Sequence, residues 1–217
     1  MIENPAPGAP GQDGSARTKA YGQDRLTPID RFGIWLSRRQ VLRWVPHVDG
    51  KAMGDFGCGY NALLAGSFLE ESARVYLADV RLSPALKANP KVVALEGMLP
   101  HAVEAIPPDS LDVVLCLSVL EHLTDADEML RQIERVLAPG GLALINVPSW
   151  RGKFFLEFSA FKLGLSPAAE MDDHKRYYDI RDLWPKLVEA GFRPSRIRCF
   201  THKFGLNTFA VCRKGVA

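Results

Sequence analysis

Asp55-Phe56-Gly57-Cys58-Gly59 is the stretch of this sequence that decides the fold. It stands between a short apolar segment, expected to form a strand, and a segment expected to form a helix. Two glycines spaced two apart let the backbone turn sharply and come close to a ligand. An acidic residue just before this turn suits a positively charged ligand, because a phosphate site favours backbone donors and a helix N-terminus.

Short apolar segments alternate with helix-like segments along most of the chain. The near-continuous apolar character of 111–117 is typical of a strand covered on both faces of a parallel sheet. We expect strands over 51–55, 74–79, 91–95, 111–117, 142–147, 194–201 and 207–213. We expect helices over 28–45, 61–69, 83–88, 101–105, 125–137 and 180–190. The pattern predicts an α/β fold with a doubly wound, mostly parallel seven-stranded sheet, helices on both faces and an antiparallel C-terminal edge strand pair.

The expected organisation is a tail followed by one domain. Residues 1–20 are rich in proline and glycine and predict a disordered tail, and 21–217 predict a single domain. Its expected parts are an N-terminal helix over 27–46, a ligand-binding core over 51–148, a lid over 149–180, and a C-terminal helix with strands over 181–213. The lid carries an aromatic stripe at helical spacing, which is also typical of core packing: Phe154, Phe158, Phe161 and Leu165.

Composition and charge narrow the function classes. The chain of 217 residues is 47% hydrophobic, enough for one well-packed core. It has no apolar run near the ~20 residues that span a bilayer and no signal-peptide pattern, so we expect a cytoplasmic protein. The four cysteines lack CxxC spacing and predict free thiols. Thirteen acidic and six basic side chains in 52–150, between basic flanks, do not predict a nucleic-acid surface.

Asp79 ends the second expected strand, 20 positions after Gly59. Ligands of doubly wound sheets bind outside the carboxyl ends of the strands, where the strand order reverses, so Asp79 is expected beside the glycine turn. A carboxylate there can accept both ribose hydroxyls of an adenosine; the alternatives are an exposed strand-end acid or a helix cap. Gly57-x-Gly59-x-x-Ala62 also satisfies a dinucleotide fingerprint, which keeps a nicotinamide-dependent oxidoreductase as an alternative function.

Four motifs in order resemble those of the class I S-adenosylmethionine-dependent methyltransferases, in particular the type 11 small-molecule branch. The stretch 55–59 resembles the D-x-G-x-G motif, and Asp79 resembles the ribose-binding acid. The segment 112–123, with its Glu-His ending, resembles the fourth-strand motif, and 137–145 resembles a helix end, a Pro-Gly-Gly turn and the fifth strand. The resemblance is strong over 52–148 and looser over 174–213, and it implies methyl transfer with S-adenosylmethionine as the cofactor.

The resemblance also implies site residues. Those implied to bind the cofactor are Asp55, Phe56, Gly57, Cys58, Gly59, Asp79, Val80, Glu96, Gly97, Met98, Leu117 and Ser118. The 55–59 turn would face the ammonium end, Asp79 the ribose and 96–98 the adenine. Leu117 and Ser118 would offer backbone groups near the ammonium and sulfonium, with a helix cap as the alternative role of Ser118. Two residues depart from the family pattern: Gly54 predicts a packing gap in the first strand, and Asn61 replaces a third glycine.

Methyl transfer is a displacement at an activated sulfonium, so an enzyme chiefly aligns the nucleophile and excludes water. An alcohol or phenol acceptor also benefits from a base, for which His122 and His174 are candidates beside structural roles for both. Asp172 and Asp173 precede His174, but without a second ligand cluster no metal site is predicted. The sequence predicts a small apolar or anionic acceptor methylated at oxygen. Contact with a membrane surface, and a domain that binds the cofactor without turnover, are the weaker alternatives.

Overall fold

The computed structural model describes residues 21, 28–153 and 176–216. The expected tail and the aromatic stripe of the expected lid lie outside the described residues. The helices and strands, in chain order, are α1 Pro28–Trp44, β1 Ala52–Phe56, β2 Arg74–Asp79, α2 Pro84–Lys87, β3 Val92–Glu96, β4 Leu111–Leu117, α3 Ala126–Val136, β5 Leu137–Pro148, α6 Ile180–Glu189, β6 Ile197–His202 and β7 Asn207–Arg213. Short 3-10 turns lie between them: η1 Ala65–Phe68, η2 His101–Val103, η3 Leu120–His122, η4 Pro194–Arg196 and η5 Lys203–Gly205.

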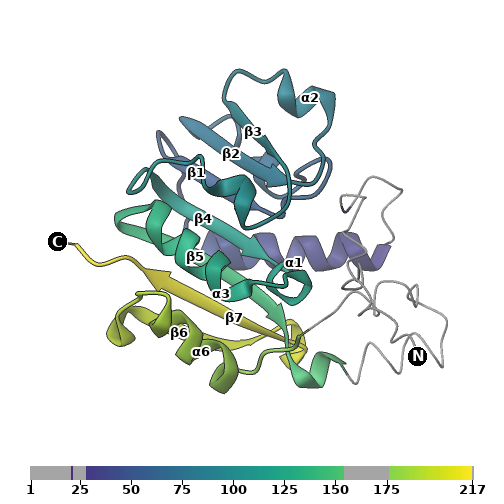
Figure 1. Ribbon diagram of the computed structural model, residues 1–217. Coiled ribbons are helices and arrows are strands. Elements are labelled where there is room, and N and C mark those ends of the chain that lie inside the picture. Colours follow the sequence, from purple (N-terminus) through teal and green to yellow (C-terminus); the bar gives the residue numbers. More distant parts are fainter. Residues whose placement is uncertain (1–20, 22–27, 154–175, 217) are drawn as a thin grey trace, which may run out of the picture.

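The strands form one seven-stranded sheet in the order β3-β2-β1-β4-β5-β7-β6 (Figure 1). β1 pairs in parallel with both β2 and β4, β3 is parallel to β2, and β5 is parallel to β4. β7 is antiparallel to both β5 and β6, so it alone runs against the others. The predicted fold class is therefore confirmed, including the antiparallel C-terminal pair.

Two apolar layers cover the sheet, one on each face. α3 and α6 cover one face, and α1 crosses the other (Figure 1). α3 buries Met129, Leu130 and Ile133, whose three- and four-residue spacing matches the helix period. Its first turn is capped by Asp125, whose side chain accepts from the Glu128 N–H at 2.9 Å. No described helix is long and apolar enough to cross a membrane.

The helix expected over 61–69 does not form. The chain makes a turn and then the 3-10 segment η1, with Ala62 in the left-handed region at φ 42°. Ala62, Ala65 and Phe68 are all buried, and their three-residue spacing matches the 3-10 period better than the α-helical one. The left-handed residue is Ala62 rather than Asn61, the residue that stands in the place of a third glycine.

Three further boundaries differ from the expectation. The segment 101–105 shortens to η2, and the expected strand over 194–201 begins only at Ile197, after the 3-10 turn η4. β5 begins at Leu137 instead of 142, because the Pro-Gly-Gly segment forms a bulge within the strand instead of a turn before it. Gly140 takes φ 83° there, which glycine adopts without strain.

The expectation of a packing gap at Gly54 is also wrong. A Cβ at this position would lie 2.9 Å from Leu111 Cδ1 and 2.9 Å from Phe56 Cε1. The two larger side chains therefore fill the space that a bulky residue would occupy, and glycine is the residue that this packing requires.

Candidate active site

The carboxyl ends of the parallel strands meet at one edge of the sheet. β2 and then β3 lie on one side of β1, and β4 and then β5 lie on the other, so the strand order reverses between β1 and β4. Asp55 lies one residue before the end of β1, and Asp79 is the last residue of β2. The topology therefore brings both carboxylates to the reversal point, where doubly wound sheets bind their ligands.

The turn after β1 requires both of its glycines. Gly57 has φ 77° and Gly59 has φ 76°, a conformation that side chains with a Cβ rarely adopt. A Cβ on Gly57 would clash with Val119 Cγ2, and one on Gly59 would lie 2.7 Å from the carbonyl oxygen of Tyr21. The Gly57 N–H donates to the Ala78 carbonyl at 2.7 Å, which fixes the turn to β2. Neighbouring protein atoms thus occupy the space beside both glycines, and a side chain has no room there.

The two side chains beside Gly57, those of Phe56 and Cys58, differ in how far they are buried. Phe56 is fully buried in the core, so it can offer only its backbone to a ligand. Cys58 is half-buried, and burial, followed by the nearby carboxylates, raises the pKa of its thiol far above the usual range. All four cysteines are free thiols, as the sequence predicts.

Asp79 ties the glycine turn to the end of β2. One carboxylate oxygen accepts from the Gly59 N–H at 2.8 Å, and the other accepts from the Val80 N–H at 2.8 Å. A carboxylate oxygen can accept more than one hydrogen bond, so these two bonds are compatible with a hydroxyl donor from a ligand. Asp79 is partly exposed at the edge of the sheet.

Asp55 is buried at 5% exposure beside Asp79. Burial, followed by the charge of Asp79, raises the pKa of its carboxyl from 3.8 to about 7, and a backbone hydrogen bond from Ala65 opposes the shift. Two carboxylates that hinder each other's ionisation form a site that a cation stabilises.

The residues expected to border the adenine lie at the end of β3 and just after it. Glu96 accepts from the Leu82 N–H at 2.7 Å and contacts the Lys87 ammonium at 3.2 Å, and these interactions lower the pKa of its carboxyl. Glu96 therefore organises the loop after β2. Gly97 donates its N–H to the Asp79 carbonyl at 3.0 Å, and Met98 is 46% exposed beside it.

Ser118 follows β4 in the left-handed region at φ 60°. Its N–H donates to the Asn146 carbonyl at 2.7 Å, and its hydroxyl accepts from the Asn146 side chain at 3.1 Å. Ser118 is thus fixed to β5 and does not cap the following turn, whose cap position is Val119. Leu117, half-buried at the end of β4, brings its backbone to the same edge.

Of the two candidate bases, His122 lies within the described residues and His174 does not. His122 ends η3, which directly follows β4, and is half-buried at the carboxyl edge of the sheet. His174 lies outside the described residues, as do Asp172 and Asp173. Within the described ranges, no group of three or more metal-binding side chains comes together.

Four polar residues of this edge are not among the predicted site residues. They are Glu121, Asn146, His202 and Lys203. Glu121 and Asn146 are almost fully buried, and the Asn146 carbonyl oxygen Oδ1 has no hydrogen-bond partner among the described residues. Burial lowers the pKa of the His202 ring to about 4 and lowers the pKa of the Lys203 ammonium, while the charge of Glu121 raises the latter. Two of the four could be noticed in the sequence: Asn146 is a polar residue inside an apolar strand, and Glu121 is the glutamate of the Glu-His ending.

These features fit a nucleoside that carries positive charge. The buried carboxylate of Asp55 gains from a neighbouring cation, the oxygens of Asp79 are hydrogen-bond acceptors at the sheet edge, and the glycines keep side chains out of the turn. A pyrophosphate would instead bring negative charge against two carboxylates.

Comparison with known proteins agrees with this geometry. A family profile described as "Methyltransferase domain" matches residues 54–145. A ubiquinone biosynthesis O-methyltransferase of Aeromonas salmonicida is 30% identical over 163 residues, which cover 69% of this chain and 68% of that protein. The chain belongs to the class I methyltransferases, in their type 11 branch. Their cofactor is S-adenosylmethionine, which decides between the two cofactors that the glycine spacing allowed.

Other relatives of this methyltransferase domain are more distant. A probable S-adenosylmethionine-dependent methyltransferase of Mycobacterium tuberculosis is 25% identical over 178 residues, covering 79% of this chain. The chain spans 60% of the length of that relative. The crystal structure of a methyltransferase from Archaeoglobus fulgidus has a TM-score of 0.61 at 14% identity and covers 83% of this chain and 94% of its own. This likeness shows the shared fold.

Proposed function

We propose that this protein transfers a methyl group from S-adenosylmethionine to an oxygen atom of a small acceptor. The observation that carries the proposal is the pair of carboxylates, Asp55 and Asp79, on either side of the glycine turn. Asp55 would face the ammonium end of the cofactor, and Asp79 would accept from the ribose hydroxyls. Leu117 and Ser118 would supply backbone groups, and the backbone from Glu96 to Met98 would border the adenine.

Bound S-adenosylmethionine supplies an electrophilic methyl group on a sulfonium. The protein's own residues then have three tasks: to hold the acceptor oxygen in line with that methyl group, to exclude water, and to take the proton of the acceptor hydroxyl. Asn146 is suited to the first task, because its carbonyl oxygen Oδ1 is buried without a described partner at the edge where the chain turns after β4. We assign the third to His122, which accepts the proton on a ring nitrogen. His174 is a second candidate.

The residues proposed to surround the methyl acceptor favour an apolar or anionic small molecule. Lys203 lies at the same edge, in the turn after β6, with an ammonium whose desolvation makes a bound anion favourable. The O-methyltransferase names of two relatives, from Aeromonas salmonicida and Albidiferax ferrireducens, support oxygen as the methyl acceptor. The expected lid over 149–180 would close the acceptor side.

Thermal unfolding with separate ligands tests the proposal. A ligand at a hundred times its dissociation constant stabilises the folded state by about 2.7 kcal/mol. For a chain of this size, that corresponds to an upward shift of the melting temperature by roughly 5–10 °C. We expect this shift with S-adenosylhomocysteine and none with NADH. A shift with NADH alone contradicts the cofactor assignment.

Turnover is measured with S-adenosylmethionine labelled on the methyl group and a panel of phenols, catechols, their carboxylated forms and aromatic amines. We expect label in an ether product from at least one hydroxylated acceptor. Label in amine or carbon-methylated products would overturn the oxygen assignment. S-adenosylhomocysteine binding with no product from any acceptor class would favour a cofactor-binding domain without turnover.

A further inference from the structure

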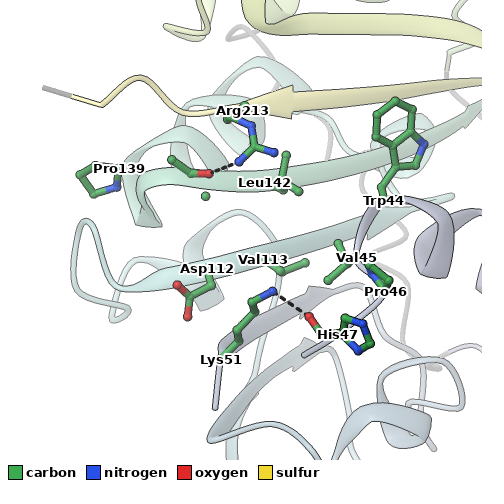
Figure 2. A pocket seen from close by; sticks show the side chains of 12 residues that line it. Trp44, Val45, Pro46, His47, Lys51, Asp112, Val113, Pro139, Leu142 and Arg213 are labelled. Atoms are coloured by element: carbon green, nitrogen blue, oxygen red, sulfur yellow. Dashed lines mark hydrogen bonds between the residues drawn. The ribbon is translucent and has the colours of Figure 1, made fainter. Parts of the chain in front are cut away.

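A cavity lies at the edge of the sheet opposite the candidate active site. It has a volume of about 310 Å³ and is bounded by the end of α1, the start of β1, the bulge of β5 and the end of β7 (Figure 2). Val113, Leu142 and Arg213 are in register across β4, β5 and β7, so their side chains stand on one face of the sheet. The cavity is separated from the glycine turn by the length of the strands.

The floor of this cavity is apolar. Val45 and Val113 are each 2% exposed, and Leu142 is half-buried beside them. Trp44 forms one wall and is held in place by stacking on Phe200, with 6.2 Å between ring centroids. A cavity of this size and lining accepts the apolar part of a small ligand.

The rim carries two cations that no described carboxylate neutralises. Lys51 donates to the His47 carbonyl at 2.7 Å, and Arg213 donates to the Gly140 carbonyl at 2.8 Å. Neither forms an ion pair with any described residue. Figure 2 shows the two side chains on opposite sides of Val113 and Leu142. Each cation is therefore fixed in position by a neutral carbonyl and keeps further N–H donors for a ligand.

The cavity also contains one acid, Asp112, whose carboxylate already accepts a backbone hydrogen bond. Its Oδ2 accepts from the Ala52 N–H at 2.8 Å and so caps the start of β1. Two cations against one carboxylate leave the cavity with a net positive charge, and the imidazole of His47 adds a further donor at the rim.

We propose that this cavity binds a small amphipathic carboxylate. The carboxylate lies between Lys51 and Arg213, where charge-assisted hydrogen bonds from both cations hold it. The apolar part lies on Val113 and Leu142 against the indole of Trp44. The site is separate from the methyl-transfer site and does not depend on it.

Calorimetric titration of the full chain with 2-naphthoate tests this proposal, with 2-naphthalenemethanol as the neutral analogue. We expect one saturable site with a dissociation constant of roughly 1 mM or tighter for the carboxylate, and at least roughly tenfold weaker binding of the alcohol. Lys51→Met and Arg213→Met should each weaken naphthoate binding by roughly tenfold. Arg74→Met, which removes an exposed cation from the start of β2 outside the cavity, should leave it unchanged.

Repeating the naphthoate titration with saturating S-adenosylhomocysteine shows whether naphthoate binds in this cavity or in the active site. The affinity for naphthoate should be the same with and without S-adenosylhomocysteine. Competition between the two ligands would place naphthoate at the active site and overturn the proposal. The proposal also fails if wild-type protein shows no saturable binding up to roughly 10 mM, or if Lys51→Met and Arg213→Met bind as the wild type does. Melting curves of the variants confirm that each is folded before titration.

Discussion

Replacing Asp55 by asparagine should stabilise the ligand-free protein, and more so at higher pH. Burial and the charge of Asp79 raise the pKa of Asp55 from 3.8 to about 7 in the folded state. Between these values the folded state binds more protons than the unfolded state, so this carboxyl makes stability fall as pH rises. At about 1.36 kcal/mol per pKa unit, the full cost of ionising Asp55 is about 4 kcal/mol and is present above about pH 7. The neutral amide of the variant carries no such cost.

The test compares urea unfolding of the wild type and Asp55→Asn at several pH values without ligand. The difference in unfolding free energy should grow by roughly 2–3 kcal/mol in favour of the variant between about pH 5 and about pH 8. Taking the difference removes the titration of all other groups and any constant effect of the amide. Asp49→Asn, at an exposed aspartate, serves as the matched control and should show no such growth. A difference that stays constant with pH would refute the assigned environment of Asp55.

Three further predictions concern the cofactor and the chemistry. Asp79→Ala should weaken S-adenosylhomocysteine binding by at least roughly tenfold in calorimetric titration, because hydrogen bonds to a charged group are lost, whereas Asp49→Ala should bind normally. Gly59→Ala should lower the unfolding free energy by roughly 1–2 kcal/mol or more in urea titration, since its Cβ would meet the Tyr21 carbonyl; a variant as stable as wild type contradicts this close approach. His122→Gln should lower kcat by roughly 10²–10⁴-fold with unchanged cofactor affinity, and unchanged kcat would exclude it as the base.

Much of the fold was predictable because its signals are local. The strands 74–79, 111–117 and 207–213 have the bounds expected from their apolar runs, and the antiparallel C-terminal pair follows from the short connection before β7. The glycine turn was predictable for the same reason, since Gly57 and Gly59 both require a backbone that other residues rarely adopt.

The predictions that were wrong concern positions where contacts with residues distant in the sequence decide the structure. A helix over 61–69 fits the local composition, but burial of Ala62, Ala65 and Phe68 against the sheet selects three-residue spacing. Gly54 predicts a gap only if its neighbours are unknown; Leu111, from a strand much later in the chain, closes it.

Candidate site residues that stand at the end of a single strand could be predicted from the sequence. Residues whose position depends on several elements packing together could not. Asp55 and Asp79 follow from strand ends and spacing, and the structure places them together. Glu96 looks equivalent in the sequence, but its carboxylate is engaged by the Leu82 N–H and Lys87, residues that only the folded loop brings near. Lys203 carries no local signal, because its burial beside Glu121 arises from packing between the turns that follow β4 and β6.

The central claim is that two carboxylates and a glycine turn hold a cationic nucleoside at the carboxyl edge of the sheet. A crystal structure of the complex with S-adenosylhomocysteine tests it most directly. We expect the ribose hydroxyls within hydrogen-bond distance, about 3 Å, of Asp79, and the ligand's amino group on the Asp55 side of the turn. Density for the ligand elsewhere, with neither carboxylate in contact, would contradict the account.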